Sequence, residues 1–210
     1  MKERPDVRLP EMWDDTWNAE PEYHAGLGLD LKLWREMDDE LRKLLGPIII
    51  ADVAGGRGEF LWWIRTEGET LVEWSTLFDF SSVAIEAARK AGRADEYCLC
   101  PAEEIGYEDS AFHVTVAIDL LQVVDDPRVV LAELCRVTAK KDGKVTPASL
   151  GRVVFVIAET PHWQQLHRLE TAEWYAMARE FGEVEAAISV DDPAGHVLYV
   201  IKPRGVAGIV

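Results

Sequence analysis

Two acidic residues and two glycines stand where a nucleoside-type ligand could bind. The stretch IIIADVAGGRGEF, Ile48 to Phe60, passes from an apolar strand pattern through Asp52 to Gly56 and Gly58 and then into a new apolar pattern. Glycines let a backbone approach a ligand closely, and the helix that follows offers unpaired N–H groups. Asp79 ends the next strand pattern about 20 residues after the glycines, where a carboxylate can accept hydrogen bonds from both hydroxyls of a ribose.

The spacing of the glycines argues against a dinucleotide. A nicotinamide-binding loop follows the pattern Gly-x-Gly-x-x-Gly/Ala, whereas counting from Gly56 and Gly58 puts Leu61 at the third position. A small residue is needed there so that the helix can pack closely on the strand. A nicotinamide enzyme therefore stays only as a third alternative, behind the two that are given below.

Strand and helix patterns alternate along the chain and define the elements that must position these residues. Short runs rich in Ile and Val predict strands at 47–53, 75–80, 96–100, 112–118 and 152–158, and a closing pair of strands at 183–190 and 196–202. Apolar residues at helical spacing predict helices at 31–46, 58–66, 81–92, 125–137 and 171–182. This alternation predicts an α/β fold with a mostly parallel sheet. Trp62, Trp63 and Trp74 are expected in the core rather than stacked on a cofactor.

Length and charge narrow the class of protein. The 210 residues, 48% of them hydrophobic, suit one domain with a sizeable core. A net charge of −16, from 38 acidic and 22 basic residues, would repel a phosphate backbone, so we expect no nucleic-acid partner. The chain has no apolar run of the roughly 20 residues that a membrane span needs. Three cysteines, Cys98, Cys100 and Cys135, fit a reducing compartment, and we expect a cytoplasmic protein without a membrane partner.

From LRKLLGPIIIADVAGGRGEFLWWI to its end, the chain resembles the class I S-adenosylmethionine-dependent methyltransferases, in particular methyltransferase type 11. DVAGGRG resembles the family's acidic strand end and glycine loop, and FDFSSVAIEAARKAG its second strand and helix. The segment from Cys100 to Val137 is the most specific match. The resemblance implies a Rossmann-like three-layer sandwich with a mostly parallel seven-stranded sheet whose last strand is antiparallel. It also implies a single methyltransferase domain over 1–210, with 1–45 as an N-terminal arm and helix contributing to a lid.

The resemblance further implies a cofactor, S-adenosyl-L-methionine, which is released as S-adenosyl-L-homocysteine, and a small-molecule acceptor. By this likeness Asp79 binds the ribose, Phe80 lies beside the adenine, Ala102 and Glu103 border it, and the end of the fourth strand lies under the methionine part. The cofactor-binding residues are then Asp52, Ala54, Gly56, Gly58, Asp79, Phe80, Ala102, Glu103, Ala117, Ile118 and Asp119.

Three positions depart from the family pattern. Ala54 replaces the first loop glycine, Pro101 stands where many relatives have an adenine-binding aspartate, and His113 replaces the usual aspartate of "SFD". An alanine fits the loop only if its φ is negative. These departures support an alternative hypothesis, a catalytically degenerate methyltransferase-fold protein that binds a ligand or partner through the same cleft.

Two segments are expected to form the acceptor pocket. Trp13, Trp17, Tyr23 and His24 could form an aromatic lid over cofactor and substrate, or could simply pack the N-terminal arm onto the domain. In TPHWQQLHRLE, His162 is the candidate base and His167 a weaker one, because an imidazole titrates near neutrality. Trp163 could shape the pocket or anchor the core. We predict no metal, because Asp126 is explained as a helix cap and Asp119 and Asp125 lack further ligands.

Overall fold

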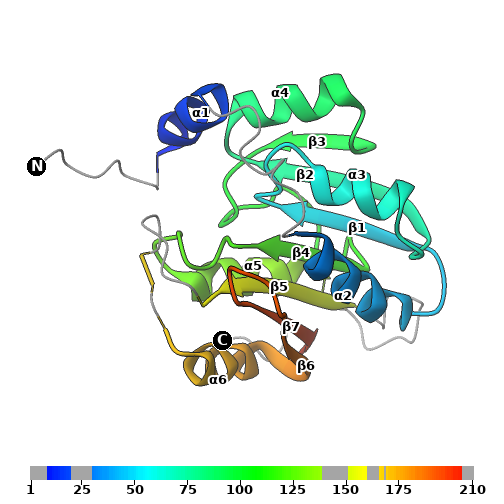
Figure 1. The fold of residues 1–210 in the computed structure, drawn as a ribbon, viewed down its shortest axis with the longest axis vertical. Coiled ribbons are helices and arrows are strands. Elements are labelled where there is room, and N and C mark those ends of the chain that lie inside the picture. Colours follow the sequence, from blue (N-terminus) through cyan, green and yellow to red (C-terminus); the bar gives the residue numbers. More distant parts are fainter. Residues whose placement is uncertain (1–8, 20–29, 139–150, 160–165, 168, 205–210) are drawn as a thin grey trace, which may run out of the picture.

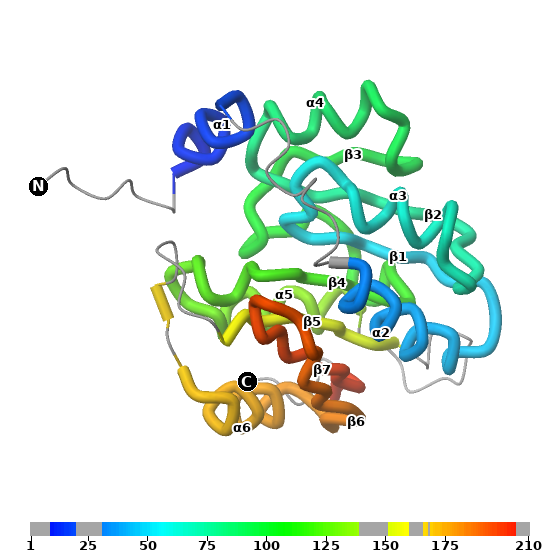
Figure 2. The backbone as a smooth tube through the Cα atoms, in the orientation of Figure 1, coloured from blue at the N-terminus to red at the C-terminus, as the bar shows by residue number. Residues whose placement is uncertain are grey.

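A computed structural model describes residues 9–19, 30–138, 151–159, 166–167 and 169–204. Its six helices are α1 (Pro10–Ala19), α2 (Asp30–Arg42), α3 (Glu59–Thr66), α4 (Ser82–Ala91), α5 (Pro127–Thr138) and α6 (Thr171–Phe181). The seven strands are β1 (Ile48–Val53), β2 (Val72–Asp79), β3 (Glu96–Leu99), β4 (Val114–Ile118), β5 (Arg152–Ala158), β6 (Gly182–Ser189) and β7 (His196–Pro203). Figure 1 shows their arrangement, and Figure 2 shows the path of the chain between them.

The strands form one sheet in the order β3-β2-β1-β4-β5-β7-β6. Strand β1 pairs in parallel with β2 on one side and with β4 on the other. Strand β7 is antiparallel to both of its neighbours, β5 and β6. The predicted seven-stranded, mostly parallel sheet with an antiparallel last strand is therefore confirmed. Strand order reverses between β1 and β4, and their carboxyl ends are where an open α/β sheet binds its ligands.

Helices cover both faces of the sheet, which gives the three predicted layers. On one face α2, α3 and α4 pack on a core that includes Leu33, Met37, Leu61, Ile85 and Val116. On the other face α5 and α6 pack on a second core that includes Leu131, Leu134, Trp174, Phe155 and Tyr199. Side chains of a strand alternate between the two clusters, as with Ile50 and Ala51 in β1, because successive residues point to opposite faces.

Local sequence signals fix most of the helix ends. Ser81 caps α4 by accepting a hydrogen bond from the amide of Ala84, and Gly92 ends the helix in the left-handed conformation with φ 66°. The helix predicted over 31–46 already ends at Arg42, and Leu45, which lies within the predicted range, is exposed with φ 48°. The core assignment holds for Trp63 but is wrong for Trp62 and Trp74, whose side chains are exposed on α3 and β2.

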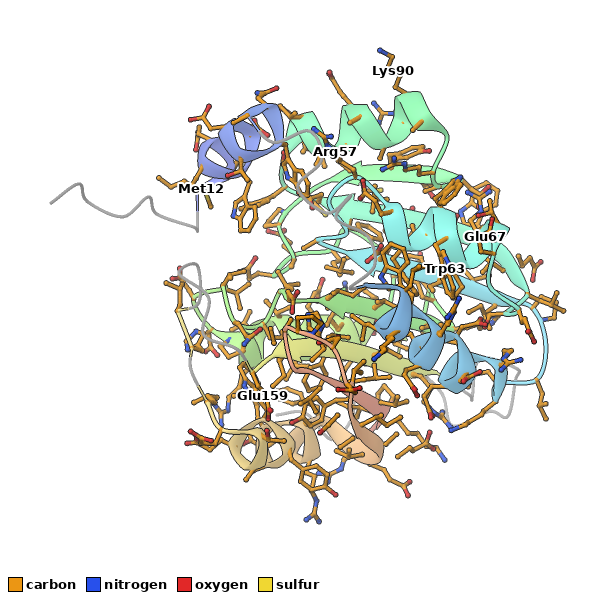
Figure 3. The ribbon with its side chains drawn as sticks, in the orientation of Figure 1. Met12, Arg57, Trp63, Glu67, Lys90 and Glu159 are labelled. Carbon is orange, nitrogen blue, oxygen red and sulfur yellow. The ribbon has the colours of Figure 1, made fainter. Side chains whose placement is uncertain are left out.

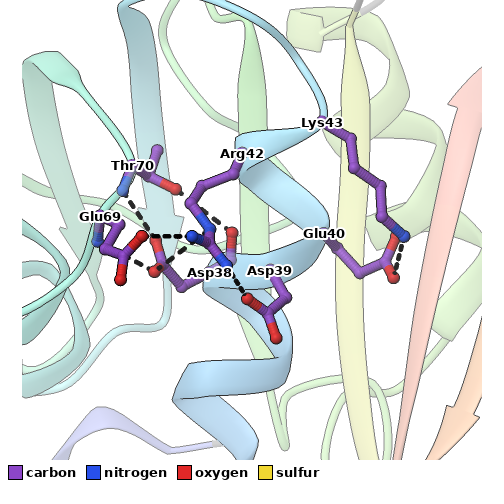
Figure 4. Close-up of polar contacts among 7 residues, drawn as sticks. All are labelled: Asp38, Asp39, Glu40, Arg42, Lys43, Glu69 and Thr70. Carbon is purple, nitrogen blue, oxygen red and sulfur yellow. Dashed lines mark hydrogen bonds and ion pairs between the residues drawn. The ribbon is translucent and has the colours of Figure 1, made fainter.

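A buried carboxylate fixes α2 to the turn that precedes β2. Asp38 accepts hydrogen bonds from the amides of Glu69 and Thr70, both at 2.9 Å, and Figure 4 shows these contacts. Arg42 pairs with Asp39 and Glu69 around the same carboxylate. The turn leads into the amino end of β2, so this anchor lies at the edge of the sheet opposite to the carboxyl ends of the strands. It stabilises the fold away from the candidate site.

Candidate functional site

The loop between β1 and α3 contains three residues in the left-handed conformation. Ala54 has φ 57°, Gly56 has φ 57° and Gly58 has φ 74°. The expectation that Ala54 keeps a negative φ is wrong: the loop requires the conformation that glycine adopts freely, and an alanine occupies it at a cost of about 1–2 kcal/mol. The loop closes through a hydrogen bond from the amide of Gly58 to the carbonyl of Gly55, at 2.9 Å. The family's glycine preference at position 54 thus has a backbone cause.

Asp52, at the end of β1, lies directly under this loop. Its side chain is 1% exposed, and neither carboxyl oxygen has a hydrogen-bond partner among the described residues. A Cβ added to Gly55 would lie 2.5 Å from Cγ of Asp52, so position 55 must be glycine even though the sequence pattern drew attention to Gly56 and Gly58. Burial, followed by the charges of Asp79 and Glu59, raises the pKa of Asp52 to about 8.

Asp79, at the end of β2, links the loop to the start of α4. Its carboxylate accepts hydrogen bonds from the amide of Gly56 at 2.9 Å and from the amide of Ser81 at 2.8 Å. Burial raises the pKa of Asp79 to about 6, although the bonds from Ser81 and Gly56 oppose that rise. The amide of Phe80 also donates to this carboxylate, whose two oxygens together still have capacity for a further donor, as a ribose hydroxyl would supply.

Helix α1 lies over the same loop. The indole of Trp17 is buried against Gly56, where an added Cβ would be 2.8 Å from Cζ2, and the guanidinium of Arg57 donates to the carbonyl of Trp17 at 2.6 Å. Asp14 accepts hydrogen bonds from Ser81 Oγ and, at 3.3 Å, from the amide of Val83. Figure 1 shows α1 beside α4, and Figure 3 labels Arg57 near both helices. Trp17 therefore covers the glycine loop, while Trp13 is half-buried on the same helix.

The remaining predicted cofactor residues differ in what they can present to a ligand. Phe80 and Ile118 are half-buried directly after β2 and at the end of β4, and Glu103 is exposed. Ala102 and Ala117 belong to the core that α5 and α6 cover, so they would contact a ligand through their backbone atoms. Asp119 follows β4 with φ 55°, and its amide donates to the carbonyl of Val156 at 3.1 Å.

Several predicted acceptor-site residues, Tyr23, His24, His162 and Trp163, lie outside the described residues. His167 is described, and its Nε2 lies 2.8 Å from the carbonyl oxygen of Val124 and 3.2 Å from that of Asp125. A ring nitrogen so placed donates to these carbonyls and holds the segment after β5 against the loop after β4. His113 has a similar structural role, because its Nδ1 accepts a hydrogen bond from the amide of Ile49 at 3.0 Å.

Metal-binding geometry is not found in the described part of the chain, where His, Cys, Asp and Glu form no group of three or more. Cys98 and Cys100 are free and half-buried, and Cys135 is free and buried. Burial raises the pKa of Cys100 to about 11 and that of Cys135 to about 12, so both thiols stay protonated near neutral pH.

Sequence reasoning missed a cluster at the start of β7. His196 is 5% exposed; its Nδ1 lies 2.7 Å from Asp192 Oδ2, and its Nε2 lies 3.3 Å from Asp119 Oδ2. Burial lowers the pKa of His196, but the hydrogen bonds and charges of Asp119 and Asp192 outweigh burial and raise the pKa to about 9. The spacing of Asp192 and His196 around the turn DDPAG was visible in the sequence. Their pairing with Asp119 was not, because it depends on the position of β7 beside β5.

Comparison with known proteins identifies the class of this fold. The family model described as "Methyltransferase domain" matches residues 51–146, which span β1 to the segment after α5. The match covers less than half of the chain, and together with the topology of the sheet it shows a methyltransferase-like fold, as the sequence resemblance implied. No curated protein matches the sequence.

Solved structures extend the likeness over nearly the whole chain. The complex of the Haloferax volcanii Trm112 methyltransferase activator with a methyltransferase gives a TM-score of 0.70 at 15% identity, covering 94% of this chain and 98% of that one. Magnesium protoporphyrin IX methyltransferase from Synechocystis PCC 6803, solved with bound SAM, gives 0.65 at 11% identity, covering 96% and 100%. The cyclase SpnF gives 0.67 at 14% identity, covering 88% and 75%. Identities this low show the fold alone. No helix in the described ranges is long and apolar enough to span a membrane.

Proposed function

We propose that this protein transfers a methyl group from S-adenosylmethionine to a small-molecule acceptor. The observation that carries the proposal is the carboxyl group of Asp52, which is buried under the glycine loop with neither oxygen hydrogen-bonded within the described residues. Such a group is costly unless a ligand completes its surroundings. A ligand with a cationic group over the loop would do so, and S-adenosylmethionine carries both an ammonium and a sulfonium.

The residues at the carboxyl ends of the strands fit that cofactor. Asp79 has free acceptor capacity for ribose hydroxyls, and the backbone of Gly56 and Gly58 allows close approach. Phe80 follows Asp79 and offers an aromatic face for the adenine, while Ala102 and Glu103 follow β3. Ala54, Ala117, Ile118 and Asp119 complete the set around the ends of β1 and β4. When bound, the cofactor supplies an activated methyl group.

Catalysis of methyl transfer depends mainly on position. The protein must hold the acceptor in line with the methyl group and exclude water. Side chains that shape and close the pocket are therefore more important than acids and bases. Trp13 and Trp17 on α1 are proposed as part of the lid, and Tyr23, His24 and Trp163 as further lining. His162 is proposed as a base for acceptors that must lose a proton. The acidic surface argues against nucleic-acid acceptors, and the few free cysteines support a cytoplasmic location.

The alternative is a binding module that has lost methyl transfer. Two observations favour it: the left-handed Ala54 departs from the family's glycine, and the indole of Trp17 lies on Gly56, where a cofactor would approach. The cyclase SpnF has the same fold, which shows that the fold alone does not determine the reaction. In this case the cleft would bind its ligand without turnover.

Titration calorimetry with S-adenosylmethionine and S-adenosylhomocysteine tests the proposal. We expect both to bind one site per chain, and Asp79→Asn to weaken both. Asp191→Asn is the matched control, because Asp191 is an exposed carboxylate in the β6–β7 turn that pairs with Lys32 on the surface. Failure of either compound to bind at millimolar concentration would contradict the proposal. Binding without methyl release to any acceptor would favour the alternative.

A further inference from the structure

The cluster around His196 is an ion network at the same edge of the sheet as the glycine loop. His196 begins β7, Asp192 lies in the β6–β7 turn, and Asp119 follows β4. Both neighbours of the imidazole are carboxylates, so both ring nitrogens act as donors, at 2.7 Å to Asp192 and 3.3 Å to Asp119. The ring is therefore an imidazolium between two carboxylates, and the side chain of Asp192 is almost fully buried.

This network holds one side of Asp119 and leaves the other side without a bond. Oδ2 of Asp119 faces His196, whereas Oδ1 is buried and has no hydrogen-bond partner among the described residues. The whole side chain is still 42% exposed. The left-handed φ of 55° and the amide bond to Val156 fix the backbone from which the carboxylate projects. Asp119 is thus a positioned carboxylate with capacity for a donor that the described residues do not supply.

The order of strands places this carboxylate beyond the proposed cofactor groups. At the carboxyl ends of the parallel strands, Asp79 ends β2, Asp52 is the last residue but one of β1, Asp119 follows β4 and Ala158 ends β5, and His196 begins the antiparallel β7 beside them. Two of the carboxylates proposed for the cofactor, Asp52 and Asp79, lie on the β2–β1 side. Asp119 is next along the sheet, and its partner His196 lies two strands further.

We propose that the methyl acceptor is an amine, and that Asp119 stabilises the positive charge that develops on its nitrogen, while His196 and Asp192 are positioning residues for Asp119. The inference rests on the proposed methyl transfer. The nitrogen lone pair forms the new N–C bond while the pair of the C–S bond passes to sulfur. Positive charge therefore moves from sulfur to nitrogen, and no proton has to be transferred in this step.

An amine suits this carboxylate better than a hydroxyl or an acid. A hydroxyl acceptor needs a base to take its proton, whereas Asp119 is already hydrogen-bonded to the His196 imidazolium. A fixed carboxylate beside an amine nitrogen, by contrast, faces charge where it develops and needs no rearrangement during the reaction. An anionic acceptor would be repelled by Asp119 together with the neighbouring acidic groups. The network therefore favours a nitrogen compound that enters this step as the free amine, because an ammonium has no lone pair with which to form the N–C bond.

Methylammonium is the smallest probe of this site. We expect methylammonium chloride to raise the thermal midpoint of the protein saturated with S-adenosylhomocysteine, relative to potassium chloride at the same ionic strength, and sodium acetate to have no such effect. Asp119→Asn should weaken methylammonium binding at least tenfold, and by a clearly larger factor than it weakens S-adenosylhomocysteine binding, for which Asp119 is only one of several proposed contacts. Asp191→Asn, which removes an exposed charge from the β6–β7 turn, is the control and should leave both unchanged.

The positioning role of His196 needs a second pair of variants. His196→Gln keeps an amide N–H that can donate to Asp119 and should retain most methylammonium binding, whereas His196→Leu should lose it with the affinity for S-adenosylhomocysteine preserved. The inference is overturned if methylammonium does not bind the wild type, if acetate binds as well, or if Asp119→Asn weakens S-adenosylhomocysteine as much as methylammonium. Wild-type protein that does not bind S-adenosylhomocysteine would contradict the proposed function itself.

Discussion

The two sides of the candidate site differ in whether their carboxylates are paired with a counter-ion. On the β2–β1 side, Asp52 and Asp79 are buried without a cation, and burial raises their pKa values to about 8 and about 6. On the β4–β7 side, an imidazolium stands between Asp119 and Asp192; burial raises the pKa of Asp192, but the hydrogen bonds and charge of His196 outweigh burial and lower it. One side contains a counter-ion for its carboxylates, whereas the described residues supply none to Asp52 and Asp79.

The difference bears on what each half can do. A network that already contains its counter-ion keeps one geometry and can present Asp119 to a second molecule. Carboxylates that lack a counter-ion destabilise the fold, and the free energy of unfolding recovers when a cation binds. We therefore interpret the β2–β1 side as the cofactor half and the β4–β7 side as the acceptor half.

The largest effect is expected from Asp79→Asn, which breaks the cofactor half. The substitution replaces one carboxylate oxygen, which accepts a hydrogen bond from a backbone amide, with an amide nitrogen. It also removes the negative charge to which the ribose hydroxyls would donate hydrogen bonds. Hydrogen bonds to charged groups contribute about 1.5–3 kcal/mol, so the Kd of S-adenosylmethionine should rise about tenfold to hundredfold. Calorimetric titration measures this change, and circular dichroism checks that the variant is folded. An unchanged Kd in a folded variant would show that Asp79 does not bind the ribose.

Asp52→Asn should weaken cofactor binding and stabilise the free protein. The pKa of Asp52 lies at about 8 in the fold against an ordinary value of 3.8, so its cost to stability grows as pH rises from about 4 to about 8. The variant should match the wild type near pH 4 and have a higher thermal midpoint at pH 8, by about 2–4 °C for each kcal/mol gained. Equal midpoints at both pH values would mean that the Asp52 carboxyl is not strained by burial.

His196→Gln tests the β4–β7 side through the pH dependence of the protein's stability. The pKa of His196 is raised from 6.5 to about 9, so the stability it contributes is fully present below pH 6.5 and is lost as pH rises through about 9. Thermal midpoints measured between pH 6 and 10 should fall more steeply in the wild type than in the variant over this window. Parallel curves for the two proteins would show that the imidazole does not hold its proton through the network.

The smallest effect is expected from Ala54→Gly. Glycine removes the Cβ strain of a left-handed residue but makes the unfolded chain more flexible, so the net gain should be about 1 kcal/mol and the rise in thermal midpoint about 2–4 °C. Cofactor affinity should stay equal or improve slightly. Differential scanning calorimetry with and without S-adenosylmethionine measures both quantities. A lower midpoint in the free protein would show that the alanine is not strained.

Gly56→Val, an obvious test of the glycine loop, now has a second interpretation. A side chain there meets the indole of Trp17 as well as any ligand, and φ 57° disfavours valine in any case. Loss of S-adenosylmethionine binding in this variant could therefore arise through displacement of α1. Trp17→Ala alone separates the two causes, because it removes the indole and leaves the loop intact.

Sequence patterns were sufficient for the fold and for the placement of the glycine loop beside Asp79, because both depend on local signals. Apolar runs, the Ser81 cap and the glycines each act within a few residues, and Asp52 and Asp79 end neighbouring strands. The acceptor half was not predictable in the same way, because Asp119 and His196 are 77 positions apart and meet only through the insertion of β7 beside β5. The left-handed Ala54 was also missed, since sequence shows the residue and not its φ.

Proton release on cofactor binding is the most direct test of the central claim, that the β2–β1 side is completed by a cationic ligand. S-adenosylmethionine should be titrated into the protein at pH 7 in two buffers of different ionisation enthalpy, for the wild type and for Asp52→Asn. Because Asp52 is protonated in the free protein at this pH, a cation over the loop should ionise it, and close to one proton should be released. The account predicts that this release disappears in Asp52→Asn. Binding without proton release in the wild type, or no binding at all, would contradict it.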